Sequence, residues 1–321
     1  MEPDGFVIDG WEYSFDPSQP MNKTLKVVPE DKRDTPEFLY KYYNLSHLNI
    51  DAIKNNYLYA ASRFELNDDF DCLEQLIDMK DISNERLITF YSQWHTVAEI
   101  VQDIEKYRET FALHKATNYY GGFGVISLSE NIHSQTMWAH YANSNHGFAV
   151  KFNLNNFHEN MYGPFPVNYK TDWSPIKLSD VNERLAFLYM TNIKSVHWDY
   201  EKEWRYIGMG RRMSFPPFRV DPELVDARKF NYSMNAIEEI ILGPRFINGL
   251  VRKDVKNNRI LLEPNSIEKY GIVKQELLEF ITENNMRTSR TVLKEGSKTF
   301  ELDTNPIEIN RIDENLFEVR L

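Results

Sequence analysis

Two acidic residues and one arginine in the second half of the chain, Glu201, Glu203 and Arg205, have the types and spacing of catalytic groups. If residues 203–209 form a strand, side chains two positions apart share a face, so these three lie together and Trp204 points the opposite way. The ordinary interpretation is a surface ion-pair row, which contributes about 0–1 kcal/mol. The functional interpretation is a catalytic Glu203 that Arg205 orients, with Glu201 in the substrate site. Both interpretations stay open.

A second polar group lies in the turn that contains Asn67, Asp68 and Asp71. Asx-turn and helix-capping hydrogen bonds can account for two of the three, and the remaining role is contact with a bound ligand. Asn67, Asp69 and Asp71 also carry side-chain oxygens at alternate positions, which resembles the start of a calcium loop. Cys72 occupies the position where that loop needs glycine, so we expect no metal.

A third group lies around a predicted helix over residues 134–142. Trp138 and Tyr141 are three positions apart and share a helix face, which is typical of core packing, although both can also contact a substrate. His140 lies off that line and is a candidate acid or base, against the commoner structural role of a lone histidine. Ser129 ends the preceding predicted strand and is a candidate binding residue.

The elements that must position these residues follow from the hydrophobic pattern. Predicted strands are 24–28, 38–43, 57–62, 125–129, 147–152, 165–169, 203–209 and 237–243. Predicted helices start at 44 or 46 and cover 84–118, 134–142, 180–195, 246–257 and 274–285. Strands and helices interleave without a regular βαβ cadence, so we predict an α+β fold whose mixed β-sheet has flanking helices.

Three segments are expected along the chain. Residues 1–37 are polar and rich in turns and read as an N-terminal arm, and residues 38–284 form the α+β core domain. Residues 285–321 contain alternating stretches such as Ile307–Asn310 and are predicted to form a small C-terminal β-rich extension.

Composition limits the partners. The formal net charge of −11 disfavours broad nucleic-acid binding, although a local basic groove remains compatible with it. Cys72 is the only cysteine, so no intrachain disulfide forms, and a reducing, cytoplasmic location is expected. The first residues lack a signal-peptide pattern, and no apolar run approaches the roughly 20 residues of a membrane span. We find no phosphate-loop, dinucleotide-binding, nucleophile-elbow or zinc motif.

Four segments resemble a bacterial family known as domain of unknown function 2971, over roughly residues 38–245. They are Leu39-Tyr40-Lys41-Tyr42 with Tyr59-Ala60-Ala61-Ser62, then Glu65–Asp71, then Ser127–Glu130 with Met137–Tyr141 and His146-Gly147-Phe148, and finally Trp198–Arg205. Departures occur at Leu66, where Phe is typical, at Asp69, where Pro is typical, and at Tyr43, where a basic residue is common.

The order of a strand with Lys41, a helix, a strand that ends at Ser62 and a late strand with Glu203 also resembles ADP-ribosyltransferases, particularly DarT-like toxins. This resemblance implies NAD as the substrate, with Glu203 as the catalytic carboxylate. It further implies Lys41 at a diphosphate or ribose oxygen and Tyr59 or Tyr141 stacked on nicotinamide. The protein would then be an effector or toxin of a bacterial defence or toxin–antitoxin system.

Two alternatives come from other functional classes. The protein could be a non-catalytic module of a defence system that binds a nucleotide or a protein, with the arm and the tail as contact surfaces because exposed strand edges recruit other chains. A metal-dependent nuclease using Asp68, Asp71, Glu201 and Glu203 is less favoured. The negative charge opposes DNA, and no clean nuclease motif surrounds Lys202.

Overall fold

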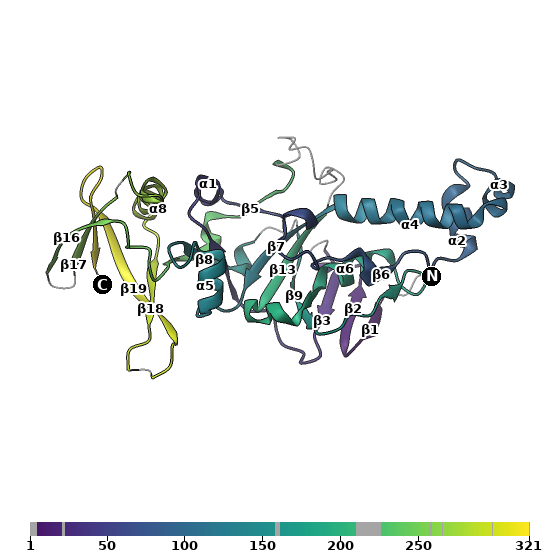
Figure 1. The fold of residues 1–321 in the computed structure, drawn as a ribbon, viewed down its shortest axis with the longest axis horizontal. Coiled ribbons are helices and arrows are strands. Elements are labelled where there is room, and N and C mark those ends of the chain that lie inside the picture. Colours follow the sequence, from purple (N-terminus) through teal and green to yellow (C-terminus); the bar gives the residue numbers. More distant parts are fainter. Residues whose placement is uncertain are drawn as a thin grey trace.

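The computed structural model describes residues 5–20, 23–157, 161–209, 226–256, 259–264, 266–296 and 298–320. One large sheet dominates these residues (Figure 1). Its strands are β4 (Phe38–Tyr43), β7 (Phe123–Ser129), β8 (Phe148–Asn153), β9 (Tyr162–Pro166), β13 (Glu203–Met209), β15 (Ile237–Leu242), β16 (Val251–Lys256), β17 (Arg259–Glu263), β18 (Thr288–Leu293), β19 (Leu302–Arg311) and β20 (Phe317–Arg320). Their order across the sheet is β16-β17-β20-β19-β18-β15-β8-β4-β7-β13-β9.

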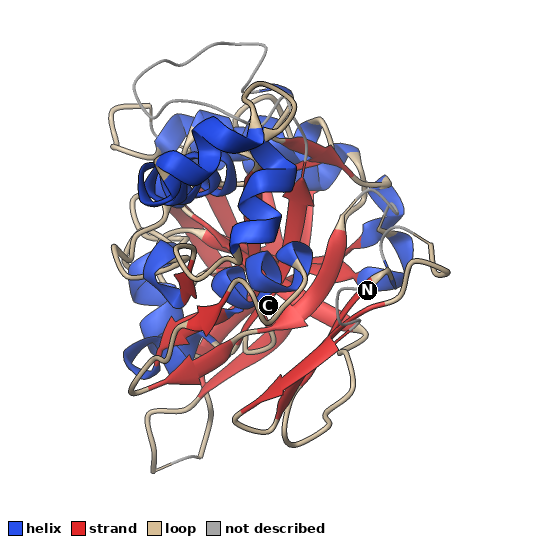
Figure 2. Cartoon of the chain, turned by 90° about the vertical axis from the view of Figure 1, so that its right-hand side faces the viewer, coloured by secondary structure: helices blue, strands red, loops and turns tan. Residues whose placement is uncertain are grey.

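The sheet is mixed, because β15 and β18 run parallel while the other paired neighbours run antiparallel. Helices flank it (Figure 2). They are α1 (His47–Lys54), α2 (Asn84–Tyr91), α3 (Val97–Gln102), α4 (Ile104–Gly121), α5 (Gln135–Tyr141), α6 (Glu183–Asn192) and α8 (Gly271–Glu283). The predicted α+β class with a mixed sheet is therefore confirmed. No helix in the described part of the chain is long and apolar enough to span a bilayer.

Shorter elements complete the fold. They are the strands β5 (Tyr57–Tyr59), β6 (Ile77–Asp78), β10 (Asn168–Lys170), β11 (Ile176–Lys177), β12 (Ile193–Ser195) and β14 (Lys229–Asn231), and the 3₁₀ helices η2 (Arg63–Glu65), η3 (Glu74–Leu76), η4 (Leu154–Asn156), η5 (Val196–Glu201) and η7 (Met234–Ala236). The strands pair as β5 with β14, β6 with β11 and β10 with β12. The 3₁₀ helix η5 ends at Glu201, two residues before β13 begins at Glu203.

The helix predicted over 246–257 is wrong. The structure has turns there, followed by β16, which pairs antiparallel with β17. Gly249 has a left-handed φ of +82°, and this conformation interrupts a helix. The hairpin with β17 then satisfies the backbone hydrogen bonds that a helix would otherwise have made within itself.

The N-terminal segment, which the sequence suggested to be a polar arm, contains regular β-structure. It forms a three-stranded antiparallel sheet of β1 (Gly5–Ile8), β2 (Trp11–Phe15) and β3 (Leu25–Val28). Tyr13, Leu25 and Val27 are buried in a core shared with α6, and the Tyr13 hydroxyl donates to Asn192 Oδ1 at 2.7 Å. At the other end of the chain, β18, β19 and β20 extend the large sheet. The segment boundaries 1–37, 38–284 and 285–321 stay predictions.

Side-chain alternation separates two cores on opposite faces of the sheet. On one face Leu128 and Trp204 pack into a core with Phe152. On the other face Val125 and Ile207 pack into a core that contains α6. Alternation along β7 and β13 puts Ser127, Ser129, Glu203 and Arg205 on this second face. The polar site residues therefore interrupt an otherwise apolar layer.

The sheet opens between β4 and β7. These strands pair at one position, Tyr40 with Ser129, whereas β7 pairs with β13 at seven positions. Farther along β7, Val125 exchanges both backbone hydrogen bonds with Ala61. Ser127 lies between the two bridges, and its carbonyl accepts a hydrogen bond from Lys41 Nζ at 3.3 Å. The Lys41 side chain thus makes the hydrogen bond to Ser127 that a backbone N–H would make in a continuous β-ladder.

We expect Gly147→Ala to destabilise the junction between α5 and β8. An added Cβ would lie 2.3 Å from the Tyr43 carbonyl oxygen, and backbone atoms cannot rotate away. Overpacking of this kind costs about 1–3 kcal/mol or more. The control is Gly296→Ala, where no atom lies within 4 Å and φ is +71°, so only backbone strain contributes. Urea unfolding of both variants checks this, and equal losses would contradict it.

Candidate functional site

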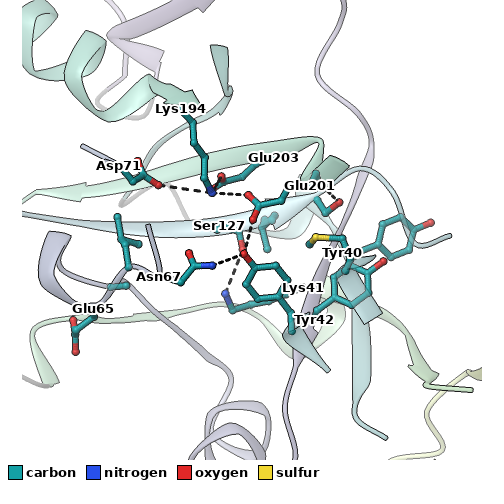
Figure 3. A pocket seen from close by; sticks show the side chains of 16 residues that line it. Tyr40, Lys41, Tyr42, Glu65, Asn67, Asp71, Ser127, Lys194, Glu201 and Glu203 are labelled. Carbon is teal, nitrogen blue, oxygen red and sulfur yellow. Dashed lines mark hydrogen bonds and ion pairs between the residues drawn. The ribbon is translucent and has the colours of Figure 1, made fainter. Parts of the chain in front are cut away.

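A cavity of about 280 Å³ lies where β4 and β7 separate (Figure 3). Strands β4, β7, β12 and β13, helix α5 and the loop around residues 61–71 contribute to its wall. Seven residues proposed from the sequence line it: Lys41, Asn67, Asp71, Ser129, Tyr141, Glu201 and Glu203. Segments that are far apart in the sequence therefore meet at one polar cavity with aromatic neighbours, which is typical of ligand sites.

Buried ion pairs form the cavity's inner wall. Lys194 Nζ lies 2.5 Å from Glu201 Oε2 and 3.0 Å from Glu203 Oε2. The Arg205 guanidinium donates to Glu203 Oε1 at 2.8 Å and holds the Asp71 carboxylate with two nitrogens. All five side chains are at most 5% exposed. The row inferred from the sequence is thus an interior network, and the surface ion-pair interpretation is wrong.

Glu203 is the most tightly held carboxylate of this network. Burial alone would raise its pKa, but attraction to Arg205 and Lys194 outweighs burial and holds the pKa well below its usual range. The pKa of Lys194 responds in the opposite sense, since attraction to Glu203 outweighs burial and raises it. Both Glu203 oxygens have cationic partners. Glu203 therefore stays ionised and bonded, which suits charge balance and positioning.

Glu201 has the opposite electrostatic character. Burial, reinforced by repulsion from Glu203, raises its pKa to about 7. Its Oε1 accepts a hydrogen bond from the Tyr141 hydroxyl, which in turn accepts one from Asn67 Nδ2 at 2.7 Å. Ser129 Oγ donates to the Glu201 backbone carbonyl at 2.6 Å and fixes η5 beside β7. The arrangement places a carboxyl group that exchanges its proton near neutral pH at the cavity wall.

Lys41 reaches the cavity through the opening in the sheet. Burial lowers its pKa to about 8, although attraction to Glu203 partly opposes the shift. Its ammonium also lies 5.8 Å from the Tyr43 ring centroid. The cavity thus contains a carboxyl group and an ammonium group whose pKa values are both shifted to near neutral pH, and perturbed pKa values of this kind cluster at functional sites.

Six predicted site residues lie outside the cavity wall. Trp138 is fully buried, donates to the Ile132 carbonyl at 2.8 Å and packs edge-on against Tyr42, so its core-packing interpretation is confirmed. His140 is exposed, and its Nδ1 lies 3.1 Å from the Tyr200 hydroxyl. The outward position of His140 separates it from Glu203.

Three of the remaining four, Tyr59, Ser62 and Asp68, shape the loop beside the cavity. Tyr59 OH donates to Glu65 Oε1 at 2.9 Å, and the Ser62 backbone N–H donates to Glu65 Oε2 at 2.7 Å. Asp68 Oδ1 accepts the Phe70 N–H at 2.9 Å, an Asx-turn bond. Arg205 likewise is not part of the wall, but it bonds to two wall residues, Asp71 and Glu203.

Sequence reasoning missed Lys194, the central cation. The residue falls at the end of the stretch predicted as a helix over 180–195, and the structure places it in β12. One signal could have revealed it, since a lysine directly after a buried apolar run requires an acidic partner. Glu65, Tyr40, Tyr42 and Ser127 also line the cavity; they lie in the segments that resemble the family, but no pattern in the sequence singled them out as site residues.

We expect Glu203→Gln to lower the stability of the fold. The change removes one of the charged partners of both Arg205 and Lys194, although Asp71 and Glu201 remain, and it turns an amide N–H₂ toward buried donors. A buried hydrogen-bonding group that loses its partner typically costs about 1–3 kcal/mol. The control is Glu318→Gln, because Glu318 is buried but its partner Arg320 is 52% exposed, so a loss of at most about 1 kcal/mol follows. Chemical denaturation measures both losses, and a fully stable Glu203→Gln protein would contradict the structural role.

Glu201→Gln tests the raised carboxyl pKa. A pKa of about 7 in the folded protein, above the usual value of 4.5, stabilises the fold below pH 4.5, and this contribution disappears as pH rises through about 7. The wild type therefore loses about 3 kcal/mol of unfolding free energy between these limits that the glutamine variant does not lose. Unfolding titrations at pH 5 and pH 8 compare the two proteins. A pH-independent difference would refute the raised pKa.

Comparison with known proteins finds a family model that is similar to part of this site. Residues 137–206 match the model of a family described as protein of unknown function (DUF2971). The match contains Tyr141, Lys194 and the 201–205 segment, and it does not reach Lys41 or the 65–71 loop. Searches of curated proteins and of solved structures returned no match. Over residues 137–206, the chain is therefore similar to a family whose function is undescribed.

Proposed function

We propose that the cavity transfers a glycosyl group from a nucleotide-type donor, with NAD as the candidate. One observation carries this proposal: the Glu201 carboxyl group, with a pKa raised to about 7, lies between the Tyr141 hydroxyl and Lys194 in the cavity that Lys41 also lines. General acid–base catalysis is most effective when the catalytic pKa is close to the working pH. The ADP-ribosyltransferase resemblance supplies the donor, and the geometry favours Glu201 over Glu203 as the reacting carboxylate.

The roles of the chain's own residues follow from their chemistry. Ionised Glu201 accepts the proton of the acceptor group, whose heavy atom bonds to the ribose carbon as the bond from that carbon to the nicotinamide nitrogen breaks. The electron pair of the broken bond leaves with nicotinamide. Lys41 provides a cation for phosphate or ribose oxygens, and Tyr40 and Tyr42 provide aromatic surface. Glu203 keeps Lys194 and Arg205 in place.

The cavity is small for a whole dinucleotide. Its volume of about 280 Å³ lies at the lower end of ligand sites. It would enclose the reacting end of the donor, and the rest would extend along the 61–71 loop. The role as an effector or toxin in a bacterial defence system rests on the resemblance alone.

A second candidate is the non-catalytic nucleotide-binding module. The observation in its favour is that both Glu201 oxygens already have hydrogen-bond partners, Tyr141 and Lys194. A carboxylate held in this way can position a ligand without moving a proton. Nucleotide binding without turnover would favour this candidate.

Purified protein incubated with NAD is expected to release nicotinamide, and Glu201→Gln is expected to reduce the rate by about a hundred- to a thousand-fold. Glu318→Gln, a buried glutamate in β20, is the matched control and should keep its activity per folded molecule. Nicotinamide release and thermal melting are measured on the same preparations. Undiminished turnover by folded Glu201→Gln would exclude Glu201 as the base. No turnover by wild type, alone or with candidate acceptors, would favour the binding module.

The pH dependence provides a separate check. Glu201 must be ionised to accept a proton, so the rate rises as pH increases through about 7, and Lys41 must be protonated, so the rate falls above about 8. Lys41→Arg is expected to move the alkaline limb upward, because guanidinium remains charged there. A rate profile over pH 5–10 measures both limbs. An unmoved alkaline limb in Lys41→Arg would assign it to another group.

A further inference from the structure

A groove of about 540 Å³ lies apart from the cavity, between the N-terminal sheet and the edge of the large sheet. Its walls come from β3, the 28–35 loop and residues 163–165 of β9, and Figure 1 shows β3 beside β9. Leu25 and Phe165 contribute apolar surface. None of the groove's lining residues belongs to the Glu201 cavity, so the groove is a separate feature.

The groove has the opposite charge to the protein as a whole. Four cationic side chains line it, Lys23, Lys26, Lys32 and Arg33, against one acidic residue, Asp34. The chain carries a net charge of −11, so this local excess is unusual for it. Within the described residues, none of the three lysines has an ion pair. The groove therefore attracts anionic partners.

Arg33 is also incompletely bonded. Its nearest carboxylates are 3.7 Å away at Glu130 and 3.8 Å away at Asp31, beyond hydrogen-bond distance. Its Nε is buried without a hydrogen-bond partner, and its guanidinium lies 5.6 Å from the Trp204 ring centroid. A buried, unsatisfied guanidinium nitrogen is costly and leaves a donor for an incoming acceptor.

One wall of the groove is an unpaired strand edge. Strand β3 pairs with β2 on one side and is the edge of the three-stranded sheet. The Asp16 N–H bonds to the Thr24 carbonyl at 2.8 Å, so residues 24, 26 and 28 direct their backbone groups toward β2. By alternation, Leu25 and Val27 direct theirs toward the groove. This edge offers peptide donors and acceptors at strand spacing.

The opposite wall does not offer the same pairing. The Val167 N–H bonds to the Glu203 carbonyl at 3.0 Å, so residue 166 faces away from β13, and residue 164 lies in the bulge between the Phe165 and Tyr162 pairings. Both are prolines and have no N–H to donate. The β9 edge is therefore protected against strand addition, and only β3 can accept a new strand.

We propose that this groove binds an acidic, extended segment of a partner protein, which adds a fourth strand to the sheet at β3. The free backbone edge favours a peptide over a nucleic acid, because only a peptide can continue a β-ladder. Acidic side chains at alternate positions would face Lys26 and its neighbours, and apolar ones would face the groove floor.

The probe is a fluorescein-labelled heptapeptide, Val-Glu-Val-Glu-Val-Glu-Val, and anisotropy measures its binding to the full chain. We expect saturable binding that weakens with salt. The double charge reversal Lys26→Glu and Lys32→Glu should weaken binding by at least about tenfold, since attraction becomes repulsion. The matched control reverses Lys54 and Lys106, which are exposed elsewhere, and should bind as wild type. Equal loss in both double variants would overturn the site.

Hydrogen exchange tests the added strand without altering the protein. Peptide binding should slow exchange of the Leu25 and Val27 amides and leave that of Lys26, already facing β2, unchanged. A heptapeptide N-methylated at alternate positions keeps its charge but should bind at least about tenfold more weakly. Full binding by it in both methylation registers would overturn strand addition. Stronger binding of a thymidine octanucleotide than of the heptapeptide would overturn the peptide assignment in favour of a nucleic-acid groove.

Discussion

Lys194 and Arg205 form buried ion pairs with Asp71, Glu201 and Glu203, and the rest of the site depends on the imbalance between these two cations and three acids. Arg205 satisfies Asp71 and Glu203 together, and Lys194 has to serve both Glu203 and Glu201. One negative charge remains in a medium that penalises it, so one carboxyl group holds its proton more strongly. This group is Glu201. Asp71 and Glu203 bond directly to Arg205, whereas the partners of Glu201 are Lys194 and the neutral Tyr141 hydroxyl.

These groups come together where the large sheet is interrupted between β4 and β7. Strands β4 and β7 meet at one residue pair, and Lys41 enters the opening that results. A continuous ladder would have placed β4 backbone opposite Ser127 and closed the cavity. Alternation along β13 then sends Trp204 into one core and Glu203 into the other face, so one strand anchors the fold and carries the charge network.

The strands and helices that depend on the local hydrophobic pattern could be predicted from the sequence. Alternation and helical spacing located β4, β7, β13, α5 and α8, and the acidic segment was recognised as unusual. Burial of that segment could not be read locally, because it depends on Lys194, whose position after α6 is set by tertiary packing. Of the N-terminal sheet only β3 was predicted, as the strand over 24–28, and β1 and β2 were missed for a similar reason. Its strands are short and half-exposed, and its three-stranded pairing becomes favourable only because Tyr13 and Leu25 pack against α6.

The excess negative charge of this network affects how a charged ligand binds in the cavity. An anionic group that binds near Lys41 adds negative charge beside Glu201 and Glu203, which favours the protonated form of Glu201 further. Binding of an anion and uptake of a proton are then linked, and each strengthens the other. Under the proposed function, nicotinamide leaves as a neutral molecule and takes no proton, so the carboxyl group has to accept only the proton that the acceptor group releases. A Glu201 pKa of about 7 suits this step, because neither form costs much free energy at neutral pH. Glu203, held ionised by two cations, cannot alternate in this way, and under the proposed function this difference favours Glu201 for proton transfer and Glu203 for positioning.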